Sequence, residues 1–299
     1  MGEKPYRVKQ TMEWIYQQRI SDIEEMSNLP ASLRKHLSDT YYLNDLEHIE
    51  TKGAADTTRK FLFRLHDGRY VETVFIPASV GLKGKQSSRK TICVSSQVGC
   101  AYGCKFCASG LAGFTRNLTA AEIIGQMLSV EKIAEQPINN IVFMGMGEPL
   151  ANLKNLTKAL EVITGHWGFN IGARSVTVST SGLAPQIRKL AEFPAPIRLA
   201  ISLHGATDEV RDLIMPINKK YPIKELFDAL HYWRTHKKQK ISLEYILIEG
   251  VNDDLDQAAI LAKRAKGLNA KVNLIPYNTV EGLNWKRPSE SHCMAFRDI

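Results

Sequence analysis

Three cysteines stand close together in the segment Cys100-Ala101-Tyr102-Gly103-Cys104-Lys105-Phe106-Cys107, with the spacing CxxxCxxC. Three thiolates on one short loop can bind three irons of a cubane iron–sulfur cluster, which leaves the fourth iron without a protein ligand. A zinc site with Cys93 as fourth ligand is the alternative, but structural zinc usually joins two separated cysteine pairs, and the sequence has no second pair. The spacing therefore favours a 4Fe-4S cluster bound by Cys100, Cys104 and Cys107.

A second motif, Met144-Gly145-Met146-Gly147-Glu148-Pro149, follows an apolar segment. Glycines let the backbone come close to a ligand, and a carboxylate such as Glu148 can accept hydrogen bonds from an ammonium group. A dinucleotide-binding fingerprint is the competing interpretation, but the third glycine of GxGxxG is missing. We therefore expect Gly147 and Glu148 to hold a small molecule.

Small polar residues also recur where later apolar segments end. Each group alone would be a cap or a turn, but a βα barrel with an active site on its carboxyl face shows this pattern repeatedly. Their coincidence with the cysteine loop predicts one shared site. The groups are Ser179-Thr180-Ser181-Gly182, Ser202-Leu203-His204-Gly205 and Pro276-Tyr277-Asn278.

The elements that must position these motifs follow from the periodicity of apolar residues. Six strands that alternate with helices predict parallel βα units, in a partial barrel or a doubly wound sheet. Thr119 to Glu122 is a capping box at the start of the helix expected near 119–135. We expect strands near 91–95, 138–144, 174–179, 197–203, 241–248 and 270–276, and helices near 119–135, 152–165, 183–192, 222–237 and 254–266.

Two smaller parts precede this α/β region, which we place at residues 91–299. Residues 1–50 have apolar positions at helical spacing, broken at Ser27-Asn28-Leu29-Pro30, and predict a small helical accessory domain that could contact RNA. Residues 51–90 contain two segments typical of strands, 61–65 and 70–76, on either side of a turn. They predict a β-hairpin and a linker.

The composition suits a globular protein with a polyanionic partner. Of 299 residues 44% are hydrophobic, and 39 Lys and Arg against 31 Asp and Glu give a net charge of +8. Such a balance favours nucleic acid without requiring it, and the basic runs 83–90 and 234–240 are each explained as well by solvated surfaces. We find neither a secretory signal nor an apolar run of about 20 residues, so we expect no membrane segment and a cytoplasmic protein with reduced thiols.

Taken in order, the motifs resemble the RlmN/Cfr family of radical S-adenosylmethionine enzymes, from about Pro5 to Arg297. The resemblance implies methylation of an adenosine of large-subunit ribosomal RNA. It is closer to the RlmN branch, which modifies adenine C2 and in some members also transfer RNA, than to the Cfr branch, which modifies C8. The motifs that carry it are the cysteine loop with 93–99 before it, Gly113-Phe114-Thr115-Arg116-Asn117-Leu118, MGMGEPL at 144–150, AISLH at 200–204, PINKKYPI at 216–223 and NLIPYN at 273–278.

The resemblance also implies cofactors and residue roles. S-adenosyl-L-methionine would bind the open iron, and an electron from a donor such as flavodoxin or ferredoxin would cleave it to a 5'-deoxyadenosyl radical. Glu72 matches the proposed proton acceptor and Cys93 the resolving cysteine, although by themselves they would be an outward-facing strand residue and a buried small residue. We expect a monomer. The residues that match the cofactor-binding positions are Gly147, Glu148, Ser179, Ser202, Leu203, His204 and Asn278.

In this family the methyl group is first carried by a cysteine near the carboxyl terminus. The sequence ends at Asp298-Ile299, inside a helix expected from Ser289, and contains no match to that cysteine motif; Cys293 lies at a different position. We therefore expect a truncated or short form that assembles the cluster and cleaves S-adenosylmethionine without methylating RNA. An RNA-binding module with a structural metal and no chemistry is the alternative from another class.

Overall fold

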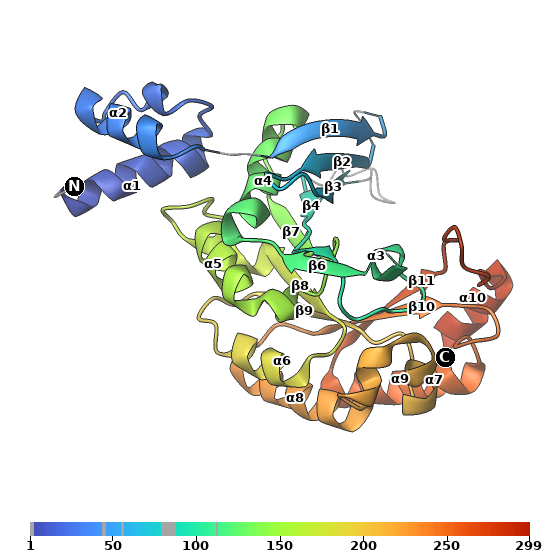
Figure 1. The fold of residues 1–299 in the computed structure, drawn as a ribbon. Helices are drawn as coiled ribbons and strands as arrows, with labels where there is room; N and C mark the ends of the chain where they lie inside the picture. Colours follow the sequence, from blue (N-terminus) through green and yellow to red (C-terminus); the bar gives the residue numbers. More distant parts are fainter. Residues whose placement is uncertain (1–2, 44–45, 55–56, 79–87, 112) are drawn as a thin grey trace. The chain divides into compact units, whose positions relative to one another are not determined.

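The computed structural model describes residues 3–43, 46–54, 57–78, 88–111 and 113–299 (Figure 1). The chain forms two compact units. The first, unit 1, comprises Met1–Ser95, Leu118–Gly145 and Lys154–Ser175; the second, unit 2, comprises Ser96–Asn117, Met146–Leu153 and Val176–Ile299.

Unit 1 begins with a helical segment made of α1 (Pro5–Glu13), a π-helical turn (Trp14–Gln18), a 3-10 turn (Ile23–Glu25) and α2 (Ala31–Thr40). Its small core consists of Ile23, Met26, Leu29 and Leu33. The expected break before Pro30 is confirmed. The first helix ends earlier than its periodicity suggested, because Arg19 adopts a left-handed conformation (φ 55°) and Asp22 caps the following turn.

The sheet of unit 1 has the strand order β1-β2-β3-β4-β7. The hairpin expected from residues 61–65 and 70–76 is confirmed as the antiparallel pair β2 and β3. On one face Phe61, Phe63 and Phe75 are fully buried, each contributing roughly 1.5–3 kcal/mol. β1 was not expected, because its residues are polar and mostly exposed. The strands are β1 (Glu47–Lys52), β2 (Arg59–Arg64), β3 (Tyr70–Pro77), β4 (Lys90–Cys93) and β7 (Asn140–Phe143).

Helix α4 (Ala120–Ala134) follows, and its expected capping box is present, with Thr119 and Glu122 each bonding the backbone of the other. Gln126 on this helix is fully buried and accepts hydrogen bonds from Thr73 Oγ1 and Ser95 N while it donates to Ser95 O. The helix is thereby fixed to both β3 and the segment that follows β4. Helix α5 (Leu153–Thr164) comes after β7.

Unit 2 contains the four parallel strands β8-β9-β10-β11, with helices between them. Figure 1 shows α6, α8 and α9 together on one side of these strands. A separate antiparallel pair, β5 (Gln97–Gly99) and β6 (Phe114–Asn117), flanks the cysteine loop and the short helix α3 (Ala108–Leu111). The other elements are β8 (Val176–Thr180), α6 (Ala184–Ala191), β9 (Arg198–Ser202), α7 (Asp208–Ile214), α8 (Ile223–His236), β10 (Ser242–Leu247), α9 (Leu255–Leu268), β11 (Lys271–Pro276) and α10 (Glu290–Asp298).

The six strands and five helices expected from residue 91 onward are all present, with ends that differ by a few residues. Two features differ from expectation. Helix α7, which Thr207 Oγ1 caps, is not among the expected helices, and β5 and β6 are too short to show periodicity. No helix in the described part of the chain is both long and apolar enough to cross a membrane.

Candidate cofactor and catalytic site

The cysteine loop of unit 2 is closed at its base by the β5–β6 pair. Cys100 N donates to Gly113 O at 2.9 Å, and a Cβ on Gly99 (φ +71°) would lie only 1.8 Å from that oxygen. Only glycine allows this closure. Farther along the loop, Lys105 N donates to Ile214 O at 2.9 Å, which fixes the loop to the last residue of α7.

The three loop thiols are free and half-buried, with Cys107 N bonded to Cys104 O. Among the described residues, no three His, Cys, Asp or Glu side chains are gathered closely enough to bind a single metal ion. A mononuclear zinc site needs four ligands at about 2.0–2.3 Å from one ion. A cubane cluster instead takes one thiolate on each of three irons, and the loop offers that donor set.

Burial keeps the thiols of Cys100 and Cys104 protonated in the metal-free chain. It raises the pKa of Cys104 to about 12; the thiols of Cys100 and Cys107 and the Glu148 carboxylate raise it further, and the Arg211 guanidinium opposes them. Burial also raises the pKa of Cys100, against a backbone hydrogen bond at Tyr102. Binding of a cluster must therefore release protons from the loop.

The Glu148 carboxylate connects strand ends. Its Oε1 accepts from Leu150 N at 3.0 Å, and its Oε2 accepts from Ser181 N and Oγ at 2.7 and 2.8 Å. The backbone N–H of Glu148 donates to Gln97 Oε1 at 2.8 Å. Glu148 therefore holds together β5, the loop before η3 (Pro149–Asn152) and the end of β8. Burial raises the pKa of Glu148, and these hydrogen bonds oppose that effect.

Close packing requires glycine at position 147, and the sequence alone did not reveal this. A Cβ there would lie 2.4 Å from the Cβ of Gln97, and the backbone has φ +99°. Met146 O also accepts from Ser96 N and Gln97 N. The close approach is thus to β5, which leads into the cysteine loop.

His204 joins the end of β9 to the cysteine loop. Its ring packs edge-on against Phe106 at a centroid distance of 4.7 Å, and its Nδ1 accepts from Ile246 N at 3.0 Å. Burial, with the nearby Arg211 charge, lowers the pKa of His204 to about 3, so the ring is neutral at neutral pH. These contacts give His204 a structural role in joining the end of β9 to the loop.

The remaining sequence-predicted cofactor positions follow the strand ends of unit 2. Ser179 lies near the end of β8 and is buried, Ser202 ends β9 and is half-buried, and Leu203 is fully buried with its N–H bonded to Glu244 O. Asn278 follows β11 and is exposed.

Sequence reasoning missed Arg211, a fully buried arginine on α7. Its Nη1 donates to Ser202 O and Leu203 O, and its Nη2 donates to Ser181 O. Arg211, Ile214 and Met215 are spaced i, i+3, i+4 and are all buried, which is the spacing of an apolar helix face. That spacing was the available signal.

Glu72 and Cys93 belong to unit 1, where they share one face of the sheet. Cys93 pairs with Val74 in the β3–β4 register, and Glu72 lies two residues before Val74, so all three side chains point to the same side. Ser95 Oγ donates to Glu72 O at 2.5 Å, and Lys60 Nζ lies 2.6 Å from Glu72 Oε1. Burial raises the pKa of Cys93 to about 11.

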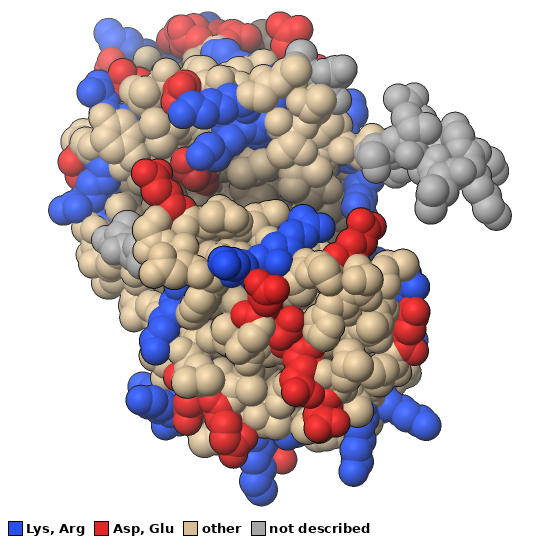
Figure 2. Space-filling model, turned by 90° about the vertical axis from the view of Figure 1, so that its right-hand side faces the viewer, with Lys and Arg blue, Asp and Glu red and all other residues tan. Residues whose placement is uncertain are grey.

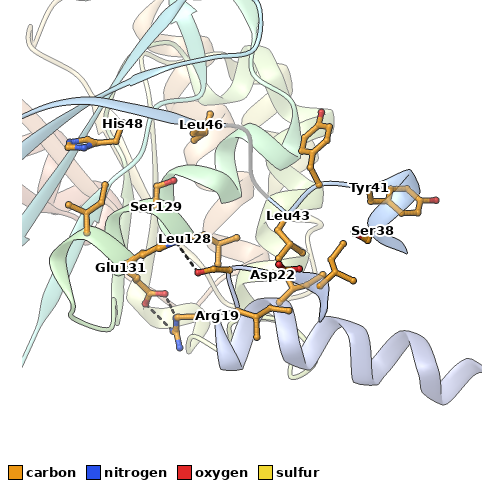
Figure 3. A pocket seen from close by; sticks show the side chains of 17 residues that line it. Arg19, Asp22, Ser38, Tyr41, Leu43, Leu46, His48, Leu128, Ser129 and Glu131 are labelled. Atoms are coloured by element: carbon orange, nitrogen blue, oxygen red, sulfur yellow. Dashed lines mark hydrogen bonds and ion pairs between the residues drawn. The ribbon is translucent and has the colours of Figure 1, made fainter. Parts of the chain in front are cut away.

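Unit 1 also has a pocket of about 590 Å³ between the helical segment and α4, lined by none of the sequence-predicted site residues. Figure 3 shows Arg19 and Glu131 pointing toward each other there. Arg19 Nη2 donates to Glu131 Oε1 at 3.0 Å, and the Glu131 side chain is 2% exposed. The pair connects the helical segment to α4.

Comparison with known proteins first identifies the class of enzyme. The profile of the Radical SAM superfamily matches residues 94–262, and that of the ribosomal RNA large subunit methyltransferase N-terminal domain matches residues 1–43. A crystal structure of a radical SAM methyltransferase from Sphaerobacter thermophilus is 39% identical, with a TM-score of 0.90 over 98% of this chain and 85% of that chain. The fold is thus that of a radical SAM enzyme.

Curated relatives identify the family within this class of enzyme. A probable dual-specificity RNA methyltransferase RlmN of Akkermansia muciniphila is 56% identical over 99% of this chain and 83% of its own length. The dual-specificity RNA methyltransferase RlmN of Campylobacter jejuni is 43% identical over 100% of this chain and 87% of its own length. The chain belongs to the RlmN family of radical SAM RNA methyltransferases, and the Cfr alternative is not favoured.

Acid should destabilise the fold through His204. Because its folded-state pKa of about 3 lies below the ordinary 6.5, the unfolded chain binds more protons between these values, and stability is lost as the pH falls. From pH 7 to pH 5 this residue should lower the free energy of unfolding by about 2 kcal/mol. Urea unfolding of His204→Asn, which keeps an acceptor and tolerates φ +54°, should lack most of that loss; an unchanged pH dependence would contradict the assignment.

Cys104 should be a slow nucleophile in the metal-free chain. With a pKa of about 12 instead of 9, its thiolate fraction at pH 8 is about 10³-fold smaller than that of an ordinary cysteine. Alkylation by iodoacetamide, followed by peptide mass spectrometry, should show this retardation in the folded chain and ordinary reactivity in urea. Equal rates in both states would show that the thiol is not buried.

Proposed function

We propose that the chain provides the radical SAM core of an enzyme that methylates adenine C2 in RNA by way of a methyl-cysteine intermediate, whose cysteine has no match in residues 1–299. The observation that carries the proposal is the CxxxCxxC loop of unit 2, fixed at both β5–β6 and α7 beside the buried ends of β8 and β9. Membership of the RlmN family supports the substrate class.

The residues present fit the implied cofactors. Three free thiols on one loop would hold a 4Fe-4S cluster, and the polar strand ends of unit 2 would hold S-adenosyl-L-methionine. When bound, the cluster supplies the electron that cleaves the sulfonium of S-adenosylmethionine. The proposed ligands are Cys100, Cys104 and Cys107 for the cluster, and Gly147, Glu148, Ser179, Ser202, Leu203, His204 and Asn278 for S-adenosylmethionine.

The chain's own groups suit a site that must stay fixed. Glu148 accepts hydrogen bonds from two elements and His204 is held neutral between Phe106 and Ile246, so neither side chain has to reorganise for a ligand to bind. Such preorganisation keeps the reacting atoms in position, since small displacements of a cofactor cost large factors in rate.

Glu72 and Cys93 would act in proton transfer and in resolution of the RNA adduct. With a pKa of about 11 the Cys93 thiol keeps its proton at neutral pH, so a base is required before it can act as a nucleophile. Glu72 lies on the same sheet face and is our candidate proton acceptor. Lys60 holds its carboxylate in an ion pair.

The partner is RNA, and we propose large-subunit ribosomal RNA with transfer RNA as a second substrate. On the face shown in Figure 2, basic and acidic side chains are intermixed, so the excess positive charge is not gathered there into one patch. We propose that residues 1–50 form an accessory RNA-binding domain, 51–90 a hairpin and linker, and 91–299 the catalytic region. A flavodoxin- or ferredoxin-like donor, a monomeric state and a cytoplasmic location complete the proposal.

Loss of one loop cysteine should abolish cofactor cleavage. After anaerobic reconstitution, Cys104→Ala should lose iron and sulfide and form no 5'-deoxyadenosine under reduction, because the cluster needs three protein ligands. Cys293→Ala, which removes a half-buried thiol on α10, is the matched control and should retain both. One zinc and no iron in the unaltered chain would instead favour an RNA-binding module with a structural metal.

Removing the Glu72 carboxylate should separate cofactor cleavage from methylation. In Glu72→Gln, made in a chain that also carries the family's methyl-accepting cysteine segment, we expect 2-methyladenosine in ribosomal RNA to form about 10²–10⁴-fold more slowly, with unchanged iron content and 5'-deoxyadenosine formation. Mass spectrometry of RNA from a strain with this gene as its only source of the activity measures the product. Glu47→Gln is the control, since Glu47 forms a comparably exposed ion pair with Arg64 in the same sheet. An active Glu72→Gln, or 8-methyladenosine as product, would contradict the assignment.

A further inference from the structure

The Arg211 side chain donates hydrogen bonds to backbone carbonyl groups at the ends of two strands. Its Nη1 lies 3.2 Å from Ser202 O and 2.6 Å from Leu203 O, and its Nη2 lies 3.0 Å from Ser181 O. A guanidinium presents its donors in a fixed planar fork, so these three carbonyl positions are fixed relative to one another. The end of β8 and the end of β9 are thereby held at one centre.

A glycine after β9 makes room for this side chain. A Cβ on Gly205 would lie 3.0 Å from both Cγ and N of Arg211. A Cβ on Gly182, which closes the polar group after β8, would be in ordinary contact with Arg211 Nη2 at 3.4 Å, and glycine suits that position because the backbone has φ +115°.

The charge of Arg211 is retained although the side chain is buried. Burial lowers its pKa to about 10, and the Asp208 and Asp212 carboxylates oppose that effect, so it is a cation at neutral pH. Asn218 connects these groups: its Oδ1 accepts from Arg211 Nε at 2.9 Å, and its Nδ2 donates to Asp208 Oδ1 at 2.9 Å and Asp212 Oδ1 at 2.8 Å.

The same helix touches the cysteine loop. Ile214 O, one turn after Arg211, accepts from Lys105 N, which directly follows Cys104. Phe106 packs on His204, which directly follows the Leu203 carbonyl that Arg211 holds. Two independent contacts thus place the loop against the part of the structure that surrounds the guanidinium.

We propose that Arg211 is a positioning residue of the cofactor site, which aligns the ends of β8 and β9 and sets a fixed positive charge behind the cysteine loop. This inference rests on the proposed function. A fixed positive charge stabilises the more negative, reduced form of a cluster, and it therefore raises the reduction potential of a cluster bound at the loop.

Variants separate the charge from the alignment. Arg211→Gln should lower the midpoint potential by at least 59 mV, the one-electron equivalent of a tenfold change in the reduction equilibrium. Arg211→Lys keeps the charge but loses the fork, so its potential should stay near that of the unaltered protein while its affinity for S-adenosylmethionine falls about tenfold. Redox titration followed by electron paramagnetic resonance measures the potential, and equilibrium dialysis measures the affinity.

Asp212→Asn provides a test that does not depend on the folding of an arginine variant. It keeps an acceptor for Asn218 and removes a negative charge near the guanidinium, so the potential should rise. Arg264→Gln is the matched control: Arg264 donates to Ala206 O in the same β9–α7 loop, and its loss should leave potential and affinity unchanged. A merely structural role would not shift the potential in opposite directions in the two charge variants.

The outcomes distinguish this inference from the proposed function. If the unaltered protein binds no iron–sulfur cluster, the proposed function falls and the inference with it. If that protein binds a cluster and cleaves S-adenosylmethionine, but Arg211→Gln and Asp212→Asn keep its potential, the role of the charge is overturned. An unchanged affinity for S-adenosylmethionine in Arg211→Lys would overturn the alignment.

Discussion

A buried charge must find its partners inside the protein, and unit 2 is organised by this constraint at two points that meet at Ser181. The Ser181 N–H and hydroxyl donate to the Glu148 carboxylate, and the Ser181 carbonyl accepts from Arg211. One residue after β8 thus connects the buried Glu148 carboxyl group to the buried Arg211 guanidinium. An unpaired buried charge costs several kcal/mol. Breaking the hydrogen bonds of Ser181 to either Glu148 or Arg211 would leave a buried group without a partner, so the arrangement resists rearrangement as a whole.

The consequences reach the cysteine loop and the ends of β8 and β9, where most of the proposed cofactor ligands lie. Glu148 extends the connection to Gln97 and hence to the base of the cysteine loop, and Arg211 extends it to the carbonyl oxygens at the end of β9. Gly147 and Gly205 are required because side chains from other elements occupy the space of a Cβ. A cluster site and a cofactor site that share one rigid support can keep a fixed relation during turnover, which radical chemistry demands to avoid side reactions.

The sequence predicted the parts of this site that depend on local pattern. The CxxxCxxC spacing, the polar strand ends and the alternation of strands and helices are short-range signals, and the strands and helices were found close to where they were expected. Arg211 was not predicted, because an arginine in a seven-residue helix looks like a surface residue until tertiary contacts are known. The role of Glu148 as a connector was hidden for the same reason: its partner Ser181 is 33 positions away.

The distribution of residues between the two units suggests a division of chemical work. Unit 2 holds the thiols and strand ends proposed for cofactor cleavage. Glu72 and Cys93, which we propose for proton transfer and resolution of the RNA adduct, lie on one sheet face of unit 1, where Lys60 forms an ion pair with Glu72. The two sets have opposite electrostatic needs. A cluster site requires thiolates that are stabilised by fixed donors and cations, whereas a resolving thiol must stay protonated until a base removes its proton. Both thiols are protonated in the metal-free chain, because burial raises the pKa of Cys93 to about 11 and that of Cys104 to about 12; beside Cys104 the Arg211 guanidinium opposes that rise.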